Sequence, residues 1–507
     1  MASGLSAVDY AVVLAYLAVV FAMAWAFARR QHSGTDYFLA GRAMGSVPLG
    51  ASILANQASA VSLVGAPAFV ALREGGGLRW LQYELALPLA MLLIIAFLLP
   101  ALRSVPGSSV YAYAEQRFGR GTRRALAAAF LLARGLALGV ILYASALVVS
   151  EATGLGVTGA LLAVGLLSVA YTSLGGIVAD IWSDVIQLAL LWLGTLVSVV
   201  YLLGRPGVVQ AIPVERAQAL VPEFGPGAGT FALGPMLLGG LFLYLSYYGC
   251  DQSQAQRLLT ARDDASARRA LVLNGLLRFP LVLTYCGFGL LLAGLLRSDP
   301  DFAARLAGRP ADSLVPAFMT TYLPTGLRGL LLAAILAAAM SSIDSTLNSL
   351  AAVTLEDVLG RVAGSQSVWA GRATSLAWGL FAVASGLFFA RSGTGVLELV
   401  NLIGSAFYGP VLGVFTLGVL APGVGGRQAV SGLAAGLGSS AVLAIGAPGV
   451  SWLWWNPAGW LVTLGVGLLL AGKPLRLPRP AASRREAWLL GGAFAAMLLL
   501  LAALSGL

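Results

Sequence analysis

The chain has 507 residues, of which 59% are hydrophobic and only 10% are charged, and its formal net charge is +10. A soluble globular protein carries about 25% charged residues, so this composition predicts an all-α polytopic membrane protein and leaves no room for a separate soluble domain. Two cysteines and a single histidine exclude a disulfide framework, a CxxC metal site and His-rich metal or haem ligation.

The first apolar run covers residues 7–28 and is followed directly by Arg29 and Arg30. A secretory signal peptide has the opposite order, so we interpret this run as a retained anchor with its N-terminus outside. Further apolar runs bring the number of predicted spans to about fourteen. They cover residues 7–28, 47–71, 79–101, 125–149, 156–173, 177–203, 231–255, 270–296, 326–354, 371–390, 397–420, 428–447, 452–472 and 486–506.

The distribution of basic residues supports this orientation. If the chain starts outside, the cytoplasmic loops hold 20 of the 31 Lys and Arg residues and the opposite side holds nine. Arg134 and Arg278 fall inside spans. Cytoplasmic loops of membrane proteins are enriched in Lys and Arg, so the positive charge indicates topology and not nucleic-acid binding. We expect a multi-pass protein of the cell (inner) membrane.

The second predicted span reads PLGASILANQASAVSLVGAPAF and is weakly helical at its centre. Asn56, Gln57, Ser59 and Ser62 interrupt the apolar run, and a glycine and a proline follow. A broken helix exposes carbonyl groups, which are tolerated at bilayer depth only where they line a cavity. A kink packed against a neighbouring helix explains the pattern equally well.

Charged residues recur inside the spans. Glu84 lies in QYELALPLA, Arg134 in LLARGLALG and Arg278 in NGLLRFPLV. Glu84 and Arg278 would form an ordinary buried pair, and these residues would equally serve as walls of a pocket for a polar solute. Asp180 and Asp184 lie one turn apart in GIVADIWSDVIQ. We expect Asp180 to be solvated at the membrane edge and the deeper Asp184 to be functional, with a salt bridge to a cytoplasmic Arg as the alternative.

The most polar stretch at bilayer depth is AAAMSSIDSTLNS, which follows LLAAILAAA directly. At 3.6 residues per turn, Ala338, Ser341, Ser345 and Asn348 share one helix face, and Ser342 borders it. A single serine would more often bond back to its own helix. Hydroxyl and carbonyl oxygens are hard ligands suited to Na⁺, and six polar residues within eight positions favour a site for a cation or a solute.

Four stretches in this order resemble motifs of the sodium/solute symporter family: DYFLAGR, AYTSLGGIVADIWSDVIQ, DQSQAQRLL and MSSIDSTLNS. The resemblance extends from about residue 36 to about residue 420. It implies the LeuT-type fold, whose core consists of two inverted five-helix repeats. The implied divisions are an extra N-terminal helix and cytoplasmic loop at 1–46, the repeats at 47–203 and 231–420, an external loop at 204–230, and three C-terminal helices at 421–507.

The resemblance also implies a Na⁺ site. In the family the ion contacts two carbonyl groups of the broken helix, and these match Ala55 and Ala58. A third carbonyl matches Ala338, and two hydroxyl groups match Ser341 and Ser342.

Some members of the family hold a second cation beside the aspartate that corresponds to Asp184. Its remaining ligands would match Ser341, Asp344 and Ser345. Asp344 stands where the family has a hydroxyl group, and a carboxylate there would raise the cation affinity or admit a proton. Coupling to two ions is therefore a hypothesis.

The sodium–glucose branch of the family aligns locally. Glu84 falls at its sugar-binding glutamate, Arg278 at a sugar-contacting lysine and Asn401 at a glutamine. Tyr247 matches the tyrosine that closes the pocket from the cytoplasmic side.

Other positions depart from that branch. Tyr244 replaces a smaller polar residue, and Ser62 replaces a sugar-binding side chain. Arg134 has no counterpart, and a guanidinium group that faces the pocket would suit a carboxylate. A sugar, a sugar acid and a small carboxylate all stay open. The predicted solute-binding residues are Gln57, Ser62, Glu84, Arg134, Tyr244, Tyr247, Arg278 and Asn401.

These observations predict a sodium-coupled secondary active symporter that imports a small polar organic solute by alternating access. Its ligands would be Na⁺ and the solute, within a lipid bilayer. The chain has no HExxH motif and no catalytic constellation, so we do not expect an enzyme. A sodium-responsive membrane sensor and a proton-coupled carrier of the same fold are the alternatives, and the oligomeric state is open.

Overall fold

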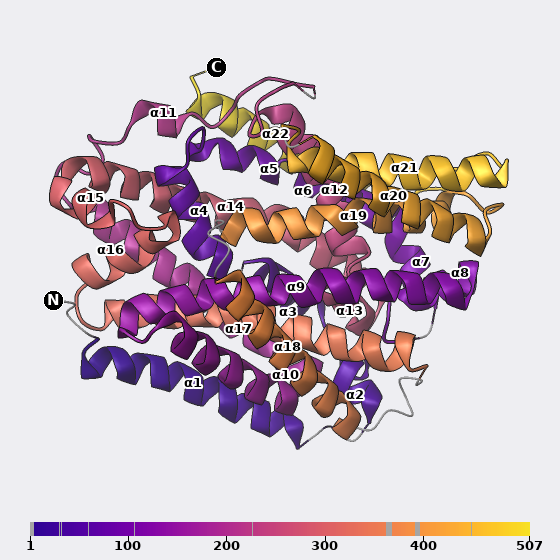
Figure 1. The fold of residues 1–507 in the computed structure, drawn as a ribbon, viewed down its shortest axis with the longest axis horizontal. Coiled ribbons are helices and arrows are strands. Elements are labelled where there is room, and N and C mark those ends of the chain that lie inside the picture. Colours follow the sequence, from indigo (N-terminus) through magenta and orange to yellow (C-terminus); the bar gives the residue numbers. More distant parts are fainter. Residues whose placement is uncertain are drawn as a thin grey trace.

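The computed structural model describes residues 5–506, except residues 30, 32, 59, 106, 226, 361–367, 391–395 and 448. In this part of the chain the secondary structure is helical, and most long helices run along the horizontal axis of Figure 1. The α-helices are α1 (Ala7–Ala28), α2 (Gly34–Leu39), α3 (Ser46–Gln57), α4 (Ala60–Leu72), α5 (Leu81–Glu84), α6 (Ala86–Leu93), α7 (Leu99–Arg103), α8 (Tyr111–Phe118), α9 (Arg120–Thr153), α10 (Val157–Leu203), α11 (Val214–Ala217), α12 (Leu233–Gly249), α13 (Gln252–Thr260), α14 (Asp264–Ser298), α15 (Pro300–Leu306), α16 (Leu314–Tyr322), α17 (Leu327–Val353), α18 (Val368–Phe389), α19 (Val396–Leu420), α20 (Gly426–Gly446), α21 (Trp455–Ala471) and α22 (Arg484–Leu504).

The helices correspond to the predicted spans. Among the described residues, eleven helices are long and apolar enough to cross a membrane. Two bent helix pairs, α3 with α4 and α12 with α13, bring the number to as many as 13, and a shorter apolar helix covers Val157–Thr172. Each of the fourteen predicted runs therefore has a helical counterpart, which agrees with a polytopic all-α protein.

Both bent pairs stand at the start of a predicted repeat. The α3–α4 pair bends by 51° next to Ala58, as the weakly helical centre of this span predicted. The α12–α13 pair bends by 50°, and the sequence analysis missed this break. Its signal is Asp251, which begins the second half as an N-cap by accepting a hydrogen bond from the backbone N–H of Ser253 at 2.9 Å. The predicted end at residue 255 is wrong, because α13 continues to Thr260.

A further break divides α10 into its two predicted spans. It lies at Gly176, where φ is +57° and ψ is −170°, a conformation open essentially to glycine alone. A Cβ atom added at this position would lie 2.9 Å from side-chain atoms of Gln31 and Tyr37. The turn therefore needs glycine both for its backbone angles and for its close contact with the segment after α1.

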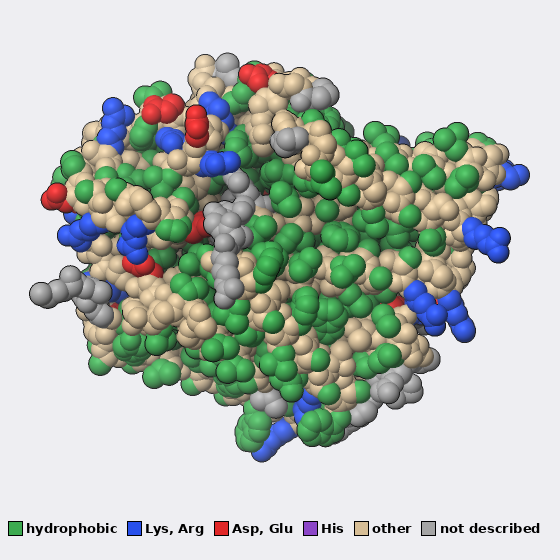
Figure 2. Space-filling model, in the orientation of Figure 1, with side chains coloured by type: hydrophobic (Ala, Val, Ile, Leu, Met, Phe, Trp, Pro, Cys, Tyr) green, Lys and Arg blue, Asp and Glu red, His purple; other side chains and the backbone are tan. Residues whose placement is uncertain are grey.

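Helix α17, which carries the SSIDSTLN stretch, lies in the interior of the molecule. Every residue from Leu331 to Val353 is buried, and the helix packs against α10, α9, α1, α18, α13 and both halves of the first bent pair. Its polar side chains are consequently surrounded by protein and not by lipid. On the face shown in Figure 2, apolar side chains cover the middle, whereas most charged side chains gather toward the left and right ends.

Candidate functional site

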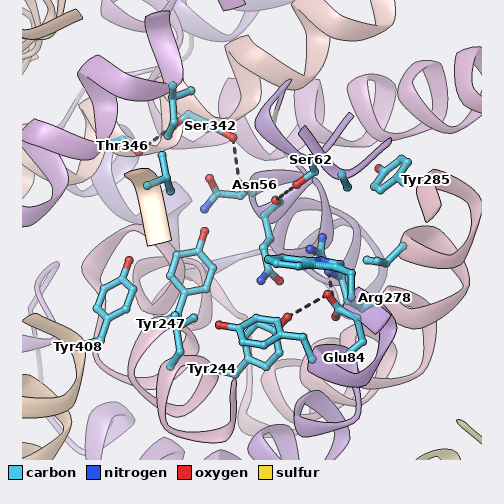
Figure 3. Close-up of a pocket in the computed structure, with 18 of the residues that line it drawn as sticks. Asn56, Ser62, Glu84, Tyr244, Tyr247, Arg278, Tyr285, Ser342, Thr346 and Tyr408 are labelled. Carbon is cyan, nitrogen blue, oxygen red and sulfur yellow. Dashed lines mark hydrogen bonds and ion pairs between the residues drawn. The ribbon is translucent and has the colours of Figure 1, made fainter. Parts of the chain in front are cut away.

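A cavity of about 110 Å³ lies between the first bent helix and the centre of the molecule. Its polar side chains come from α3, α4, α5, α9, α12, α14, α17 and α19, and several of them point toward one another in Figure 3. The lining residues are Asn56, Gln57, Ser62, Ala66, Trp80, Tyr83, Glu84, Arg134, Ile141, Leu243, Tyr244, Tyr247, Arg278, Val282, Tyr285, Ser342, Thr346, Val400 and Tyr408.

The end of α3 meets α17 at the cavity wall. The hydroxyl of Ser342 donates a hydrogen bond to the carbonyl of Asn56 at 3.1 Å (Figure 3). Carbonyl groups in the last turn of a helix lack partners in that helix, so they offer hard oxygen atoms to a cation. The ligand set drawn from Ala55, Ala58, Ala338 and Ser342 is buried at this contact and fits Na⁺ by its chemistry. Its assignment to Na⁺ stays a prediction.

Ser341, the fifth member of that set, contacts Asp184 instead. Its hydroxyl donates a hydrogen bond to one carboxylate oxygen of Asp184, while Ser52 donates to the other. The structure thus joins the two predicted cation sites through Ser341, and in this conformation its proton is directed to the second one.

The second predicted cation site contains an arginine that the sequence analysis placed in a loop. Arg257 of α13 is fully buried and forms ion pairs with Asp180 at 3.1 Å and with Asp184 at 2.9 Å. The expectation that Asp180 is solvated is wrong, since its side chain is 1% exposed and faces this guanidinium. For Asp184, the sequence left open a salt bridge to a cytoplasmic Arg. The structure contains such a salt bridge, to Arg257. The bend in α12–α13 at Asp251 brings Arg257 inside.

Asp344 lies beside this cluster and is also fully buried. One of its oxygen atoms accepts a hydrogen bond from the hydroxyl of Thr172, and the other has no hydrogen-bond partner among the described residues. Ser345 contacts both Asp180, at 3.0 Å, and the Arg257 guanidinium.

The sequence allowed two interpretations of Glu84 and Arg278, namely a buried ion pair and the walls of a solute pocket. The structure contains the buried pair. The Nε atom of Arg278 lies 3.5 Å from Oε2 of Glu84, and the hydroxyl of Tyr244 donates to Oε1 at 3.0 Å. Figure 3 shows the three side chains together at the cavity wall. Both readings therefore apply, because the pair is structural and also lines the pocket.

Arg134 is held at the cavity by Asp251, the N-cap of α13. The Nε atom of Arg134 lies 2.6 Å from Oδ2 of Asp251, and the guanidinium stacks 4.7 Å from the centroid of the Tyr247 ring. Its Nη2 atom is buried and has no hydrogen-bond partner within the described part of the chain. The Nε atom of the guanidinium is thus fixed by a carboxylate, whereas its Nη2 atom is left without an acceptor among the described residues.

Aromatic side chains form much of the remaining wall. Tyr247 accepts a hydrogen bond from Nε2 of Gln254 at 3.0 Å, and its ring lies 6.1 Å from that of Tyr408. Tyr248 donates to the side-chain oxygen of Gln57. The hydroxyl of Ser62 lies 3.4 Å from the carbonyl of Gln57. The rings give the cavity an amphipathic wall, with apolar faces and polar edges.

The structure brings together seven of the eight predicted solute-binding residues. The eighth, Asn401, lies in α19, but its side chain is outside the described residues. Sequence reasoning missed Tyr408, Thr346, Asp251 and Arg257. Thr346 lies in the motif MSSIDSTLNS, and Asp251 and Arg257 lie in the motif DQSQAQRLL. Tyr408, in SAFYGP, lies in none of the four family motifs.

Comparisons with known proteins agree with this arrangement. A model of the sodium:solute symporter family matches residues 37–436. A putative sodium-dependent multivitamin transporter of Drosophila melanogaster is 32% identical over 80% of this chain and 68% of its own length. The human sodium/iodide cotransporter is 30% identical over 82% of this chain and 66% of its own length. The human sodium-coupled monocarboxylate transporter 1 is 28% identical over 87% of this chain and 73% of its own length. The chain thus spans about two thirds of the length of these relatives.

Among solved structures, a substrate-bound, outward-open Na⁺-coupled sialic acid symporter superimposes with a TM-score of 0.82. It is 24% identical, and the match covers 93% of this chain and 99% of the other. At this identity the likeness concerns the fold, and it confirms the predicted fold class.

Proposed function

This chain belongs to the sodium:solute symporter family, and on that premise we propose that it imports a small organic carboxylate together with Na⁺. The family match confirms the resemblance seen in the four motifs. The named relatives are transporters, which agrees with the expectation that the chain is not an enzyme.

The unpaired Nη2 atom of Arg134 carries the proposal. The Nε atom of this guanidinium is bonded to Asp251, whereas its Nη2 atom is buried without a partner among the described residues. A buried donor left unpaired costs roughly 1–3 kcal/mol, so the site gains free energy when a ligand supplies an acceptor. A carboxylate is the acceptor that suits a guanidinium best, since the hydrogen bond is charge-assisted.

The size of the cavity favours a small solute. A volume of about 110 Å³ is below the roughly 150 Å³ of a cavity that holds benzene. A short-chain carboxylate fits this conformation, whereas a hexose, with twice the heavy atoms of benzene, would require the cavity to widen. The apolar faces of the Tyr247 and Tyr408 rings would contact the hydrocarbon part of such a carboxylate.

The relatives support an anionic solute. Two of the human relatives are named as a sodium/iodide cotransporter and as a sodium-coupled monocarboxylate transporter. Iodide and monocarboxylates are both anions. A second monocarboxylate transporter, from Xenopus laevis, is 27% identical over 86% of this chain.

Na⁺ acts at the contact between α3 and α17. The carbonyl groups of Ala55, Ala58 and Ala338 with the hydroxyls of Ser341 and Ser342 hold the ion, and filling this site draws the broken helix against α17. The solute binds beside it, between the two repeats at 47–203 and 231–420. Because coupling is reciprocal, bound Na⁺ raises the affinity for the solute by the same factor as the solute raises that for Na⁺. Inward release requires Tyr247 to move and the sodium site to loosen.

The protein resides in the cell (inner) membrane with its N-terminus outside. Charged groups of both signs gather at the left end of the face shown in Figure 2, whereas Lys and Arg predominate at the right end. The latter end contains the segment after α21, with the basic residues Lys473, Arg476 and Arg479. A basic end faces the cytoplasm in most membrane proteins.

Uptake into proteoliposomes tests the proposal. We expect a Na⁺ gradient, and not a K⁺ gradient, to drive accumulation of radiolabelled acetate, lactate or pyruvate, and not of galactose. The double variant R134Q/D251N removes the guanidinium and its counter-charge together, so it avoids a buried unpaired carboxylate. We expect it to raise KM for the carboxylate at least tenfold, while R205Q, in the loop just after α10, leaves KM unchanged. Sodium-driven galactose uptake, or an unchanged KM in the double variant, would contradict the carboxylate assignment.

A further inference from the structure

A second cavity, of about 260 Å³, lies between α6, α12, α19 and α21, and apolar side chains form nearly all of its wall. It shares no lining residue with the solute cavity. The polar side-chain atoms in its wall are bonded within the protein, because the hydroxyl of Thr416 accepts from the indole of Trp460 at 3.0 Å and donates to the carbonyl of Leu412 at 2.8 Å. The side chains of this wall therefore suit hydrocarbon and offer no free polar group to a ligand.

This apolar cavity is elongated and reaches the surface. Along α19 it extends from Leu412 to Leu420, which is about 12 Å at a helical rise of about 1.5 Å per residue. Leu93 and Leu477 also line it, and both side chains are exposed. Its volume of about 260 Å³ is larger than the roughly 150 Å³ of a cavity that holds benzene. Length, volume and lining therefore fit part of an acyl chain that enters from the bilayer.

The segment between α21 and α22 is anchored to two helices at this cavity. The N–H of Arg476 donates to the carbonyl of Leu420, the last residue of α19, at 2.6 Å. The N–H of Ala481 donates to the carbonyl of Ala96 at 2.9 Å. In an α-helix the Ala96 carbonyl would accept from Pro100, which has no N–H. Both anchors thus use carbonyl groups that lack an α-helical donor, and they fix the segment beside the cavity.

The anchored segment is basic. It carries Lys473, Arg476 and Arg479, and residues 472–483 include no acidic residue. The three basic side chains are exposed, and none of them forms an ion pair with the described residues. The next acidic residue, Glu486, lies 3.6 Å from Arg268. Positive charge is therefore held at one end of an apolar cavity without a counter-charge from the described part of the chain.

We propose that this place binds an anionic phospholipid, with one acyl chain in the apolar cavity and the phosphate group at Lys473, Arg476 and Arg479. The segment lies on the side that we assign to the cytoplasm, where the membrane leaflet carries anionic lipids and basic groups between helices bind their headgroups. An acyl chain has apolar surroundings in the bilayer as well. The cavity consequently fixes where the lipid sits, and the charge supplies the preference for an anionic headgroup.

Native mass spectrometry of the purified full chain tests the site. The protein in detergent is titrated with dioleoyl phosphatidylglycerol or with dioleoyl phosphatidylcholine, and the bound lipids are counted. We expect the first phosphatidylglycerol to bind at least fivefold more tightly than phosphatidylcholine. Equal affinity for the two lipids would overturn the proposal. Displacement of phosphatidylglycerol by an excess of glycerol 3-phosphate would show that the basic segment takes a free phosphate, and it would overturn the proposal as well.

Two double variants separate this basic segment from positive charge in general. R476Q/R479Q removes two charges but keeps the backbone anchor at residue 476, and we expect its affinity for phosphatidylglycerol to fall at least fivefold, to that for phosphatidylcholine. R297Q/R305Q removes two exposed arginines in the last turns of α14 and α15 and should keep the wild-type affinity. Wild-type affinity in R476Q/R479Q, or an equal loss in both variants, would contradict the site.

A variant of the wall tests the cavity itself. L93W enlarges an exposed side chain that lines it, and we expect weaker binding of both lipids with the charges intact. Unchanged affinity in a folded L93W would place the lipid outside the cavity and overturn the proposal. If L93W does not fold, the wild-type preference and the two charge variants decide.

Discussion

Two buried arginines of this protein differ in how fully their guanidinium groups are bonded. Arg257 contacts Asp180, Asp184, Ser345, Ser52 and the Ser253 carbonyl, whereas Nη2 of the Arg134 group has no partner among the described residues. A fully bonded buried network rigidifies the fold, while an unsatisfied group in a cavity has free energy to gain from a ligand. Both are buried arginines, and they differ in the number of partners that their guanidinium groups have.

The Ser342 hydroxyl is expected to decide sodium binding. Replacing it by alanine deletes a predicted ligand and also its bond to the Asn56 carbonyl. A ligand that binds only the folded state at ten times its Kd adds roughly 1.4 kcal/mol of stability. We therefore expect wild-type protein to melt higher in Na⁺ than in K⁺ at equal ionic strength, and S342A to lose this difference.

The control for this experiment is S349A on the same helix. The Ser349 hydroxyl bonds to Gln256 at 3.1 Å and lies outside the predicted ligand set. Its removal is expected to lower the melting temperature equally in both salts. A sodium-specific rise that persists in S342A would show that the ion binds elsewhere.

The two bent pairs, α3–α4 and α12–α13, meet at the scale of the elements. The side-chain amide of Asn56, at the first break, lies 3.4 Å from the carbonyl of Ser253, just after the second. That same carbonyl accepts from Arg257. Broken helices expose backbone groups at bilayer depth, and here each break supplies partners for the other. The contact links the opening helices of the two predicted repeats.

Gly176 is expected to be the least replaceable glycine of α10. G176A would place a side chain at φ +57°, ψ −170° and within 2.9 Å of Gln31 and Tyr37. Such backbone conformations cost about 1–3 kcal/mol for other residues. Thermal unfolding in detergent should show at least that loss. G159A, in the same helix with open space around its Cβ position, should be neutral or slightly stabilising, and equal melting of the two variants would argue against a strained turn.

A cluster of charges joins α8 to the start of α9 and to the segment Thr354–Val358, which follows α17. Arg123 contacts Glu115 at 2.6 Å and Glu356 at 2.9 Å, and it also pairs with Asp357. The hydrogen bond from Arg123 is the main cause that holds the pKa of Glu115 below its ordinary value of 4.5. A carboxyl group with a lowered pKa stabilises the folded state above pH 4.5, and this contribution is lost as the pH falls through the folded-state pKa.

We therefore expect E115Q to melt lower than the wild type at pH 7, by an amount equivalent to about 0.5–1 kcal/mol, and the difference to shrink as the pH falls below 4.5. Differential scanning fluorimetry across this pH range measures it. E74Q changes an exposed carboxylate in another loop and serves as the control. A difference between E115Q and the wild type that grows toward low pH would contradict the assignment.

Charge is unevenly divided over the whole molecule. On the face shown in Figure 2, apolar side chains cover the middle, and most charged groups lie toward the two ends. The native cysteines, Cys250 and Cys286, are both buried, so an introduced cysteine reports its own position. Val214 and Leu477 are 84% and 80% exposed and lie in loops that we assign to opposite sides of the membrane.

A membrane-impermeant maleimide should accordingly label V214C in intact cells. L477C should react only after the cells are permeabilised. The reverse pattern would place the N-terminus in the cytoplasm, and labelling of both in intact cells would contradict the assignment of these loops to opposite sides.

The amino-acid sequence by itself determined the helical spans and the family, and it offered the break in the first bent helix as one of two interpretations. Crossing a bilayer requires long apolar helices, so composition and run length suffice to locate them. Polar residues such as those of the SSIDSTLN stretch stand out because such groups are expensive in hydrocarbon. Buried charges have partners, and this rule predicted the pair of Glu84 with Arg278 as one of two interpretations.

Only the tertiary structure decided which groups those partners are. Arg257 appears in the sequence as a loop residue at the edge of a span, and the bend at Asp251 turns it inward to Asp180 and Asp184, more than 70 positions earlier in the chain. Tyr408 likewise reaches the cavity from α19. Contacts between distant helices depend on how bent elements pack, and local spacing does not encode that packing. Periodicity along one helix shows which side chains need a partner, whereas the identity of the partner is settled when the helices pack together.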